Sequence, residues 1–357
     1  QHGIIMSIVL GILLTLILFL MKPLLSVMQQ PEEVVAYALP YFDMLALSML
    51  PLLVFQAYKQ FADGMSHTKY AMRAAVIANV LNIALNYLLI YGKFGFPRME
   101  LMGAGLGTLI SRVAMFGFLL YMVHRKKEFA DFVTPIRFSN IKKNVLQKVF
   151  DLGYPSALQM FFEIGIFASG ILLAGVLGTH AQAANQISLN LATMTFMIAI
   201  GLGVAATIRV GNQKGLKNFK ELRRIARSVF LLMLLIDIFF ALIFIVFKDF
   251  LPWLYIDDVE VVKIAASLLV VAGLFQISDG VQVVVLGALR GLQDVKAPMY
   301  ITFVAYWIIG FPICYYLGIH TNLGALGIWI GLFVGLTASA IMLYLRFHKL
   351  TQKLKSK

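Results

Sequence analysis

The chain has 357 residues, of which 61% are hydrophobic and only 13% are charged, and its mean hydropathy is +0.86. Soluble domains carry about 25% charged residues, so this composition excludes a soluble globular protein and predicts a chain that lies in lipid. The net charge of +13 suggests a nucleic-acid partner only until the basic residues are placed along the chain. Cys314 is the single cysteine, which excludes a disulfide within the chain.

Apolar runs of about 18–25 residues, long enough to cross a bilayer as helices, recur along the whole chain. They lack the two-residue alternation of barrel strands, so an all-α polytopic membrane protein is predicted. The ten expected spans are 3–21, 40–58, 74–92, 103–123, 155–177, 185–208, 228–247, 262–286, 299–317 and 323–345.

Basic residues set the expected orientation of these spans. Most of the 30 Lys and Arg residues lie in the connections after the second, fourth, sixth and eighth spans and in the C-terminal tail. By the positive-inside rule these connections face the cytoplasm, which puts both chain ends on the cytoplasmic side of a plasma (inner) membrane. The net charge then reflects topology, and no nucleic-acid partner is expected. The first span lacks the basic flank and cleavage site of a signal peptide.

The chain also repeats itself. Residues 24–35 align with 251–262 at an offset of 227, and the same offset carries Gly64 onto Gly291 and Lys69 onto Lys296. Such ordered matches indicate two halves related by a parallel repeat. The fifth and sixth spans then have no counterpart, so we expect a parent of twelve helices in two pseudo-symmetric six-helix lobes, from which the first two helices are missing here. The expected parts are a first lobe (1–123), a cytoplasmic interlobe linker (124–152) and a second lobe (153–357).

Two carboxylates lie deep inside apolar spans. Asp279 is near the middle of the apolar stretch 271–291, and Glu163 lies in the fifth span. A charged side chain at the bilayer centre costs roughly 2.5–3.5 kcal/mol, so such residues usually face a protein interior or a water-filled cavity. One interpretation is a neutral carboxyl group hydrogen-bonded between helices. The other is a shared site for Na+ or H+, since two carboxylates repel unless a cation lies between them. Arg112 and Asp237 also lie inside spans, and the sequence identifies no partner for either.

Several motifs, in order, resemble the multidrug and toxic compound extrusion (MATE) family, closest to its NorM-type branch. They are FADGMS at 61–66, ANQIS at 184–188, AATIRVG at 205–211 and LRGLQD at 289–294. The resemblance implies a two-lobe, monomeric antiporter in the lipid bilayer that exchanges Na+ or H+ for cationic amphipathic drugs by alternating access. It implies no cofactor beyond the coupling ion.

The same resemblance assigns the coupling-cation site to Glu163 and Asp279, which would be the Na+ ligands, with the rings of Phe167 and Phe196 lining it. Some family members have a tyrosine at the position of Phe196 or at that of Phe275, which leaves the detailed coordination open.

For the drug, the resemblance points to the acidic pair Asp257 and Asp258 in an outward-facing connection, and to Gln186. Read without the family, the acidic pair is a solvated loop. Three asparagines of the third span recur at i, i+3 and i+7 and share one stripe of the helix, either as interhelical hydrogen-bond formers or as a polar cavity wall: Asn79, Asn82 and Asn86.

Other classes of function are less consistent with the sequence. The six histidines fall at helix ends or in connections, and no HExxH, Walker or GxSxG motif occurs, so neither an enzyme nor an ATP-driven pump is expected. A passive channel would need a ring-like filter segment, and neither half of the sequence contains one. The remaining alternative is a lipid-linked precursor flippase of the same superfamily, which would line its cavity with basic residues, whereas the deep charges here are mainly acidic.

Overall fold

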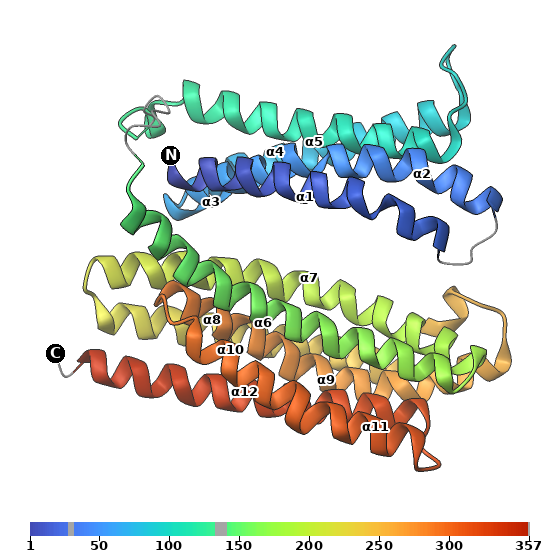
Figure 1. Ribbon diagram of the computed structural model, residues 1–357. Helices are drawn as coiled ribbons and strands as arrows, with labels where there is room; N and C mark the ends of the chain where they lie inside the picture. Colours follow the sequence, from blue (N-terminus) through green and yellow to red (C-terminus); the bar gives the residue numbers. More distant parts are fainter. Residues whose placement is uncertain (28–31, 133–140, 356–357) are drawn as a thin grey trace. The chain divides into compact units, whose positions relative to one another are not determined.

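The computed structural model describes residues 1–27, 32–132 and 141–355, and these residues are almost entirely helical (Figure 1). Ten of the described helical stretches are long and apolar enough to cross a membrane, and each overlaps one of the ten spans expected from the sequence, although the ends differ. The all-α prediction is therefore confirmed. The chain divides into two compact units, unit 1 (Gln1–Val149) and unit 2 (Phe150–Lys357).

Unit 1 contains four of the spans. Its helices are α1 (His2–Val27), α2 (Glu32–Leu47), α3 (Met49–Gly64), α4 (Thr68–Tyr91) and α5 (Glu100–Arg125), followed by a short 3-10 turn at Lys127–Phe129. The second expected span is α2 and α3 together, broken at Ser48. Arg112 of α5, which had no partner in the sequence, donates a hydrogen bond to Ser48 Oγ over 2.6 Å. A guanidinium inside the membrane is thereby bound at the helix break.

The expected linker, residues 124–152, is only partly described. Residues 133–140 lie outside the described residues. The last part of the linker, from Lys143 on, continues without interruption into the fifth span, because α6 runs from Lys143 to Val176.

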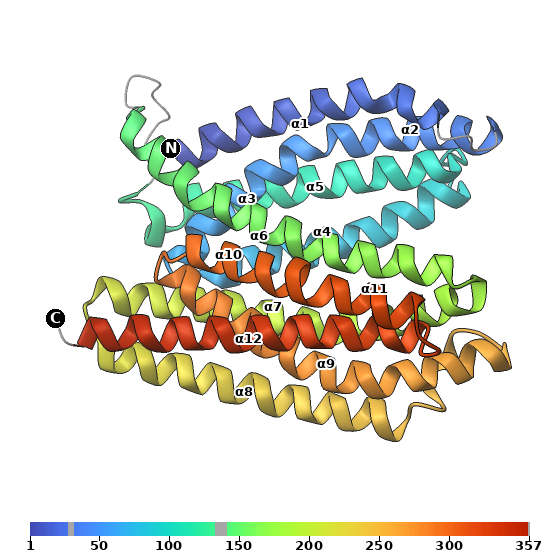
Figure 2. The same ribbon diagram turned by 60° about the horizontal axis from the view of Figure 1, so that its bottom comes forward.

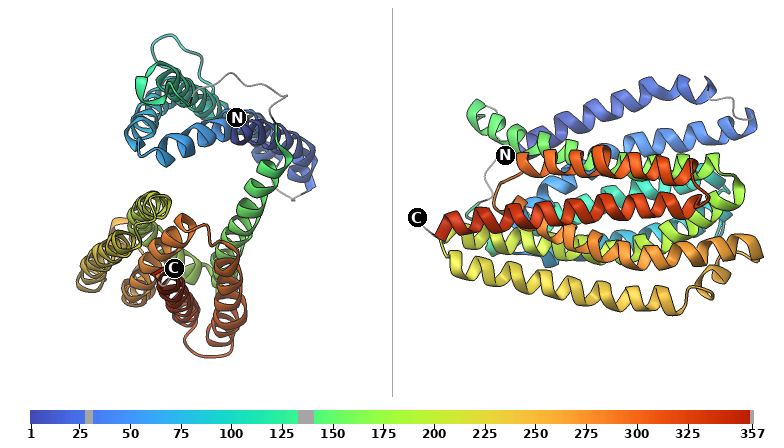
Figure 3. Two further views of the ribbon diagram at one scale, coloured as in Figure 1. Left: turned by 90° about the vertical axis from the view of Figure 1, so that its left-hand side faces the viewer. Right: turned by 90° about the horizontal axis from the view of Figure 1, so that it is seen from below.

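Unit 2 contains six spans, formed by α6, α7 (Thr179–Gly215), α8 (Phe219–Val246), α9 (Val259–Gly291), the ninth span and α12 (Ala325–Lys355). A 3-10 turn, Leu251–Leu254, precedes α9. The ninth span is composite, with α10 (Lys296–Phe303), a π-helical segment (Val304–Gly310) and α11 (Phe311–Ile319). The end-on view in Figure 3 shows how these helices run side by side.

The centre of unit 2 is α9, which packs against α7, α8 and α12 (Figure 2). Small residues bring α7 and α9 into backbone contact. A Cβ atom on Gly287 would collide with the carbonyl of Gly203, and Thr207 Oγ1 donates to the carbonyls of Gly203 (2.9 Å) and Gly287 (2.8 Å). Membrane helices associate through such small-residue contacts because lipid provides no hydrophobic driving force between them. The helix that carries Asp279 is therefore the most enclosed helix of the unit.

Candidate functional site

Glu163 is held by a hydrogen-bonded relay between α6 and α9. Gln159, one turn earlier on α6, donates from Nε2 to Glu163 Oε2 over 2.6 Å. The Oε1 atom of the same amide accepts a hydrogen bond from the Arg290 guanidinium, also over 2.6 Å. Gln159 is almost completely buried. A charged guanidinium at the end of α9 is thus linked, through one amide, to a carboxylate in the membrane-spanning part of α6.

Asp279 lies in the same unit, on α9, with a side chain that is only 6% exposed. Its Oδ1 atom is buried and accepts no hydrogen bond from the described residues. An acceptor buried without a donor costs free energy, which either a proton or a bound cation would recover.

Asp237 is the residue that sequence reasoning left unassigned, and the structure puts it beside this helix. It lies on α8, is 1% exposed, and its Oδ2 atom is buried without a hydrogen-bond partner among the described residues. Its carboxyl group fills the space above Gly280, where a Cβ atom would collide with it. The glycine next to Asp279 therefore makes room for a second carboxylate.

A stripe of polar side chains extends along α9 on either side of Asp279. Gln276 and Gln282 lie three residues before and after it, so the three side chains project from neighbouring positions of one face. Gln282 Oε1 accepts a 2.7 Å hydrogen bond from Tyr306 Oη, whereas Gln276 Oε1 has no donor among the described residues. The three-residue spacing was visible in the sequence, and this signal was missed.

Tyr306 reaches Gln282 from the π-helical segment, which is not predictable from the residue pattern. It is fully buried and lies in the middle of the ninth span. Short π-helical turns inside α-helices are frequent at functional sites because they shift the side chains that follow. Ser278 of α9 adds a second polar link of 2.8 Å, to the Thr337 hydroxyl on α12.

We refer to Glu163, Asp237 and Asp279 together as the acidic region. Aromatic rings border this region on one side. Phe167 of α6 packs edge-on against Phe275, with ring centroids 6.0 Å apart, and Phe275 packs in turn against Trp329 at 5.3 Å. The structure thus brings Phe167 to the Asp279 helix, one turn from the carboxylate. Phe196 is half-buried on α7, and no ring contact within the described residues joins it to Phe167. Phe275 is the aromatic neighbour more clearly associated with Asp279.

The side-chain atoms available as ligands determine which kind of cation this region can bind. In the described part of the chain, no group of three or more His, Cys, Asp or Glu side chains converges closely enough to hold a metal ion. The acidic region instead offers the buried carboxyl oxygens of Asp237 and Asp279 and the buried amide oxygen of Gln276. Such all-oxygen surroundings suit a hard monovalent cation or a proton rather than a transition metal.

The family model described as MatE matches residues 1–88 and 155–316. The chain belongs to the MatE family. The two matched segments fall in unit 1 and in unit 2, and both acidic residues Glu163 and Asp279 lie in the second.

Relatives cover nearly all of this MatE chain. It is 35% identical over 355 residues to the multidrug resistance protein NorM of Vibrio vulnificus, which covers 98% of the chain and 77% of that relative. It is 38% identical over 295 residues to the multidrug resistance protein MdtK of Proteus mirabilis, covering 82% of the chain and 65% of that relative. Both relatives are named as multidrug resistance proteins and not as enzymes, in agreement with the sequence prediction that this chain is not an enzyme.

Solved MATE structures share the fold. The eukaryotic MATE transporter AtDTX14 superposes with a TM-score of 0.86 at 22% identity, covering 99% of this chain and 80% of that one. An outward-facing multidrug resistance MATE transporter of the MOP superfamily gives 0.87 at 21% identity, covering 100% of this chain and 79% of that one. The MatE chain is therefore a multi-pass membrane protein with the MATE architecture.

Two of the residues expected to contact a drug, Asp257 and Asp258, lie immediately before α9. Asp258 caps α9, since its Oδ1 atom accepts from the backbone N–H groups of Glu260 and Val261, and its Oδ2 atom lies 3.6 Å from a nitrogen of His180. Asp257 and Gln186 are exposed. The buried neighbour Asn185, not Gln186, makes the polar contact of this part of α7, accepting a 2.9 Å hydrogen bond from Trp329.

The asparagine stripe is in unit 1. Asn86 donates from Nδ2 to Asn82 Oδ1 over 3.1 Å, and its own Oδ1 atom lies against Gly107 of α5 without a donor among the described residues. Asn79 is exposed. The stripe thus makes contact within its own helix and keeps a free acceptor at the α4–α5 contact.

Proposed function

We propose that the chain is a secondary active multidrug exporter that exchanges Na+ or H+ for cationic amphipathic drugs by alternating access. The observation that carries this proposal is Asp279, a carboxyl group deep in the most enclosed helix of unit 2 with a buried oxygen that no described residue satisfies. Support comes also from the family and from relatives named as multidrug resistance proteins.

Glu163 and Asp279 are proposed to hold the coupling cation. A cation or proton bound there offsets the repulsion between the two carboxylates and the cost of the unsatisfied Asp279 Oδ1 atom. Gln159 keeps the Glu163 carboxylate oriented, and Phe167 and Phe275 exclude water from one side. Na+ is the better candidate because the chain resembles the NorM type, and H+ is the alternative.

The residues proposed to contact the drug are Asp257, Asp258, Gln186, Asn79, Asn82 and Asn86. An exposed carboxylate such as that of Asp257 attracts a cationic ligand, and aromatic faces add cation–π contacts. Asp258 would act mainly through the N-cap of α9, because one of its oxygens is already used there. The protein would work as a monomer in the plasma (inner) membrane with both chain ends in the cytoplasm.

Coupling requires that the ion favour one conformation over the other. An ion shifts a conformational equilibrium only by its difference in affinity for the two states. Binding at Glu163 and Asp279 would favour the conformation that releases drug outward, so ion and drug would lower each other's apparent affinity by the same factor. The sodium or proton gradient then drives export.

The test is efflux of ethidium from proteoliposomes containing the full-length protein, with Na+ and pH gradients imposed separately. We expect efflux to respond to one gradient in the wild type and to neither in Glu163→Gln or Asp279→Asn. The matched control is Glu260→Gln, which removes a carboxylate from the exposed start of the same helix, α9, and should leave coupling unchanged. Gradient-driven efflux that survives both amide substitutions would show that these acids do not couple transport.

A further inference from the structure

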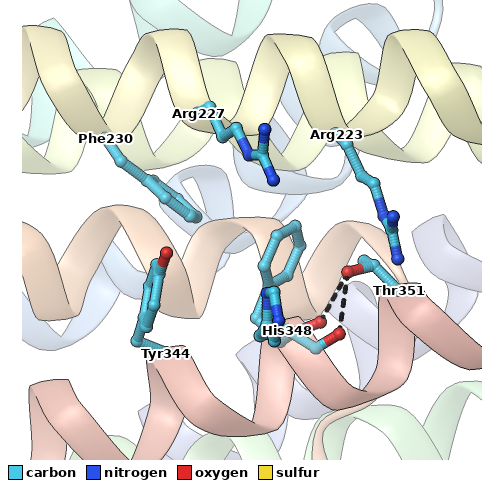
Figure 4. Close-up of a pocket in the computed structure, with 7 residues that line it drawn as sticks. Arg223, Arg227, Phe230, Tyr344, His348 and Thr351 are labelled. Atoms are coloured by element: carbon cyan, nitrogen blue, oxygen red, sulfur yellow. Dashed lines mark hydrogen bonds between the residues drawn. The ribbon is translucent and has the colours of Figure 1, made fainter.

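A second polar site lies outside the acidic region, in a pocket of unit 2 between α8 and α12 (Figure 4). Arg223 and Arg227 lie one turn apart on α8, and both extend toward α12, where His348 lies opposite them. Three side chains that carry or can carry positive charge therefore line one small pocket. The drug-export proposal uses none of them.

The Arg223 guanidinium has no hydrogen-bond or ion-pair partner in the described part of the chain. Its Nε and NH2 atoms are buried, and neither has a hydrogen-bond partner among the described residues. Neighbouring basic residues outside the pocket differ, because Arg224 lies 3.8 Å from Glu221 and Arg346 lies 2.7 Å from Asp294. Buried charges are normally paired, so unpaired guanidinium donors aimed into a pocket indicate an anionic ligand.

Aromatic side chains form the apolar wall of this pocket. The ring of Phe230 packs edge-on against Phe347, with centroids 5.4 Å apart, and against Tyr344 at 6.2 Å, while Tyr344 stacks on His348. Phe230 and Phe347 are buried, whereas Tyr344 is exposed. The pocket thus combines a cationic end with an aromatic end, and the aromatic end opens toward the outer surface of the bundle.

The pocket lies where both helices change from charged to apolar sequence. On α8, the basic segment ends at Arg227 and an apolar run starts at Val229. On α12, the apolar run ends at Leu345 and the basic tail begins at Arg346. This change marks the boundary between the hydrocarbon core and the headgroup region, the depth at which lipid phosphates lie and tyrosines are enriched. Leu231 and Ile341, on the apolar side of the pocket, are exposed enough for acyl chains to cover.

We propose that this pocket binds the phosphate of an anionic phospholipid headgroup, with the acyl chains along α8 and α12. Arg223 and Arg227 donate to the phosphate oxygens, and the planar guanidinium suits two such bonds at once. The aromatic end of the pocket contacts the glycerol and the first methylenes. Basic pockets between transmembrane helices on the cytoplasmic side are suited to anionic headgroups. The bound lipid would bridge α8 and α12 at the basic end of unit 2.

The test is native mass spectrometry of the full chain in detergent, titrated with phosphatidylglycerol or with phosphatidylcholine of the same acyl chains. The pocket variant is R223Q/R227Q. The matched control is K220Q/R224Q, which also removes two positive charges from α8, but at exposed positions outside the pocket. A guanidinium–phosphate hydrogen bond at a partly exposed site contributes about fivefold in affinity, so the pocket variant should lose about thirtyfold in phosphatidylglycerol binding. The control should lose much less, because Lys220 and Arg224 do not line the pocket.

R227Q alone keeps the test valid if the double variant does not fold, because Arg227 is exposed, and it should lose about fivefold. Equal losses in R223Q/R227Q and K220Q/R224Q would overturn the proposal, since they would reflect surface charge alone. So would equal binding of the two lipids by the wild type. A parallel titration with inorganic phosphate separates a free anion from a lipid: displacement of phosphatidylglycerol by millimolar phosphate would assign the pocket to the free anion instead.

Discussion

The relay from Arg290 through Gln159 to Glu163 gives a prediction that can be worked out from the structure. Gln159→Leu removes two hydrogen bonds of 2.6 Å, each to a charged group, and keeps a side chain of similar length. A hydrogen bond to a charged group contributes about 1.5–3 kcal/mol. Since Glu163 and Arg290 are both partly exposed, we take the lower value for each and expect unit 2 to lose about 3 kcal/mol.

For a folded unit of 150–250 residues, each kcal/mol shifts the melting temperature by about 2–4 °C, so the expected drop is about 6–12 °C. The assay is thermal unfolding of the full chain in detergent, followed by circular dichroism. Gln56→Leu is the matched control, because Gln56 is an exposed glutamine on the membrane helix α3, and we expect it to shift the melting temperature little. If Gln159→Leu melts within the range of that control, the relay does not stabilise the protein and Glu163 is held in some other way.

Three further substitutions test other parts of unit 2. Gly287→Leu should prevent correct packing of α7 on α9 and abolish a monodisperse folded protein, whereas Gly201→Leu, where a side chain meets open space, should fold normally on size-exclusion chromatography. Asp237→Asn should raise the Na+ concentration for half-maximal efflux about fivefold or more, because the Asp237 carboxyl group lies against Gly280, next to Asp279, and a nearby unit charge contributes at least about 1 kcal/mol to cation binding. An unchanged value means that Asp237 carries no charge. Asn185→Leu leaves the Trp329 N–H without its acceptor and should cost about 1–3 kcal/mol of stability by the same melting assay, and a neutral result would show that water or another group replaces Asn185.

The spans and the acidic residues could be predicted from the sequence because both depend on composition along one helix. A run of apolar residues crosses a membrane whatever its neighbours are, and Asp279 is conspicuous in such a run. What the sequence did not provide depends on contacts between helices. The closeness of Asp237 to α9 depends on how α8 packs on Gly280, and the link between Arg290 and Glu163 depends on an amide 131 residues away from the arginine.

The composite ninth span illustrates a second limit. Nothing in the residues 304–310 distinguishes a π-helical turn from an ordinary helix, since the difference is one residue in hydrogen-bond register. The direction of Tyr306 toward Gln282 follows from that register. Asp258 shows the opposite case: an Asp before an apolar helical run is a common N-cap, and that local signal was available in the sequence.

The contact between Gly203 and Gly287 has a mechanical consequence. Where two helices touch through their backbones, no layer of adaptable side chains remains to absorb a relative displacement, so α7 and α9 behave as one stiff strut at this level. Asp279 and Arg290 lie at two levels of that strut, eleven residues apart (290 − 279), which at about 1.5 Å per residue is roughly 16 Å. If an ion at Asp279 displaced α9, Arg290 would therefore move by about the same amount. The hydrogen bond from Arg290 to Gln159 would then transmit this displacement to α6.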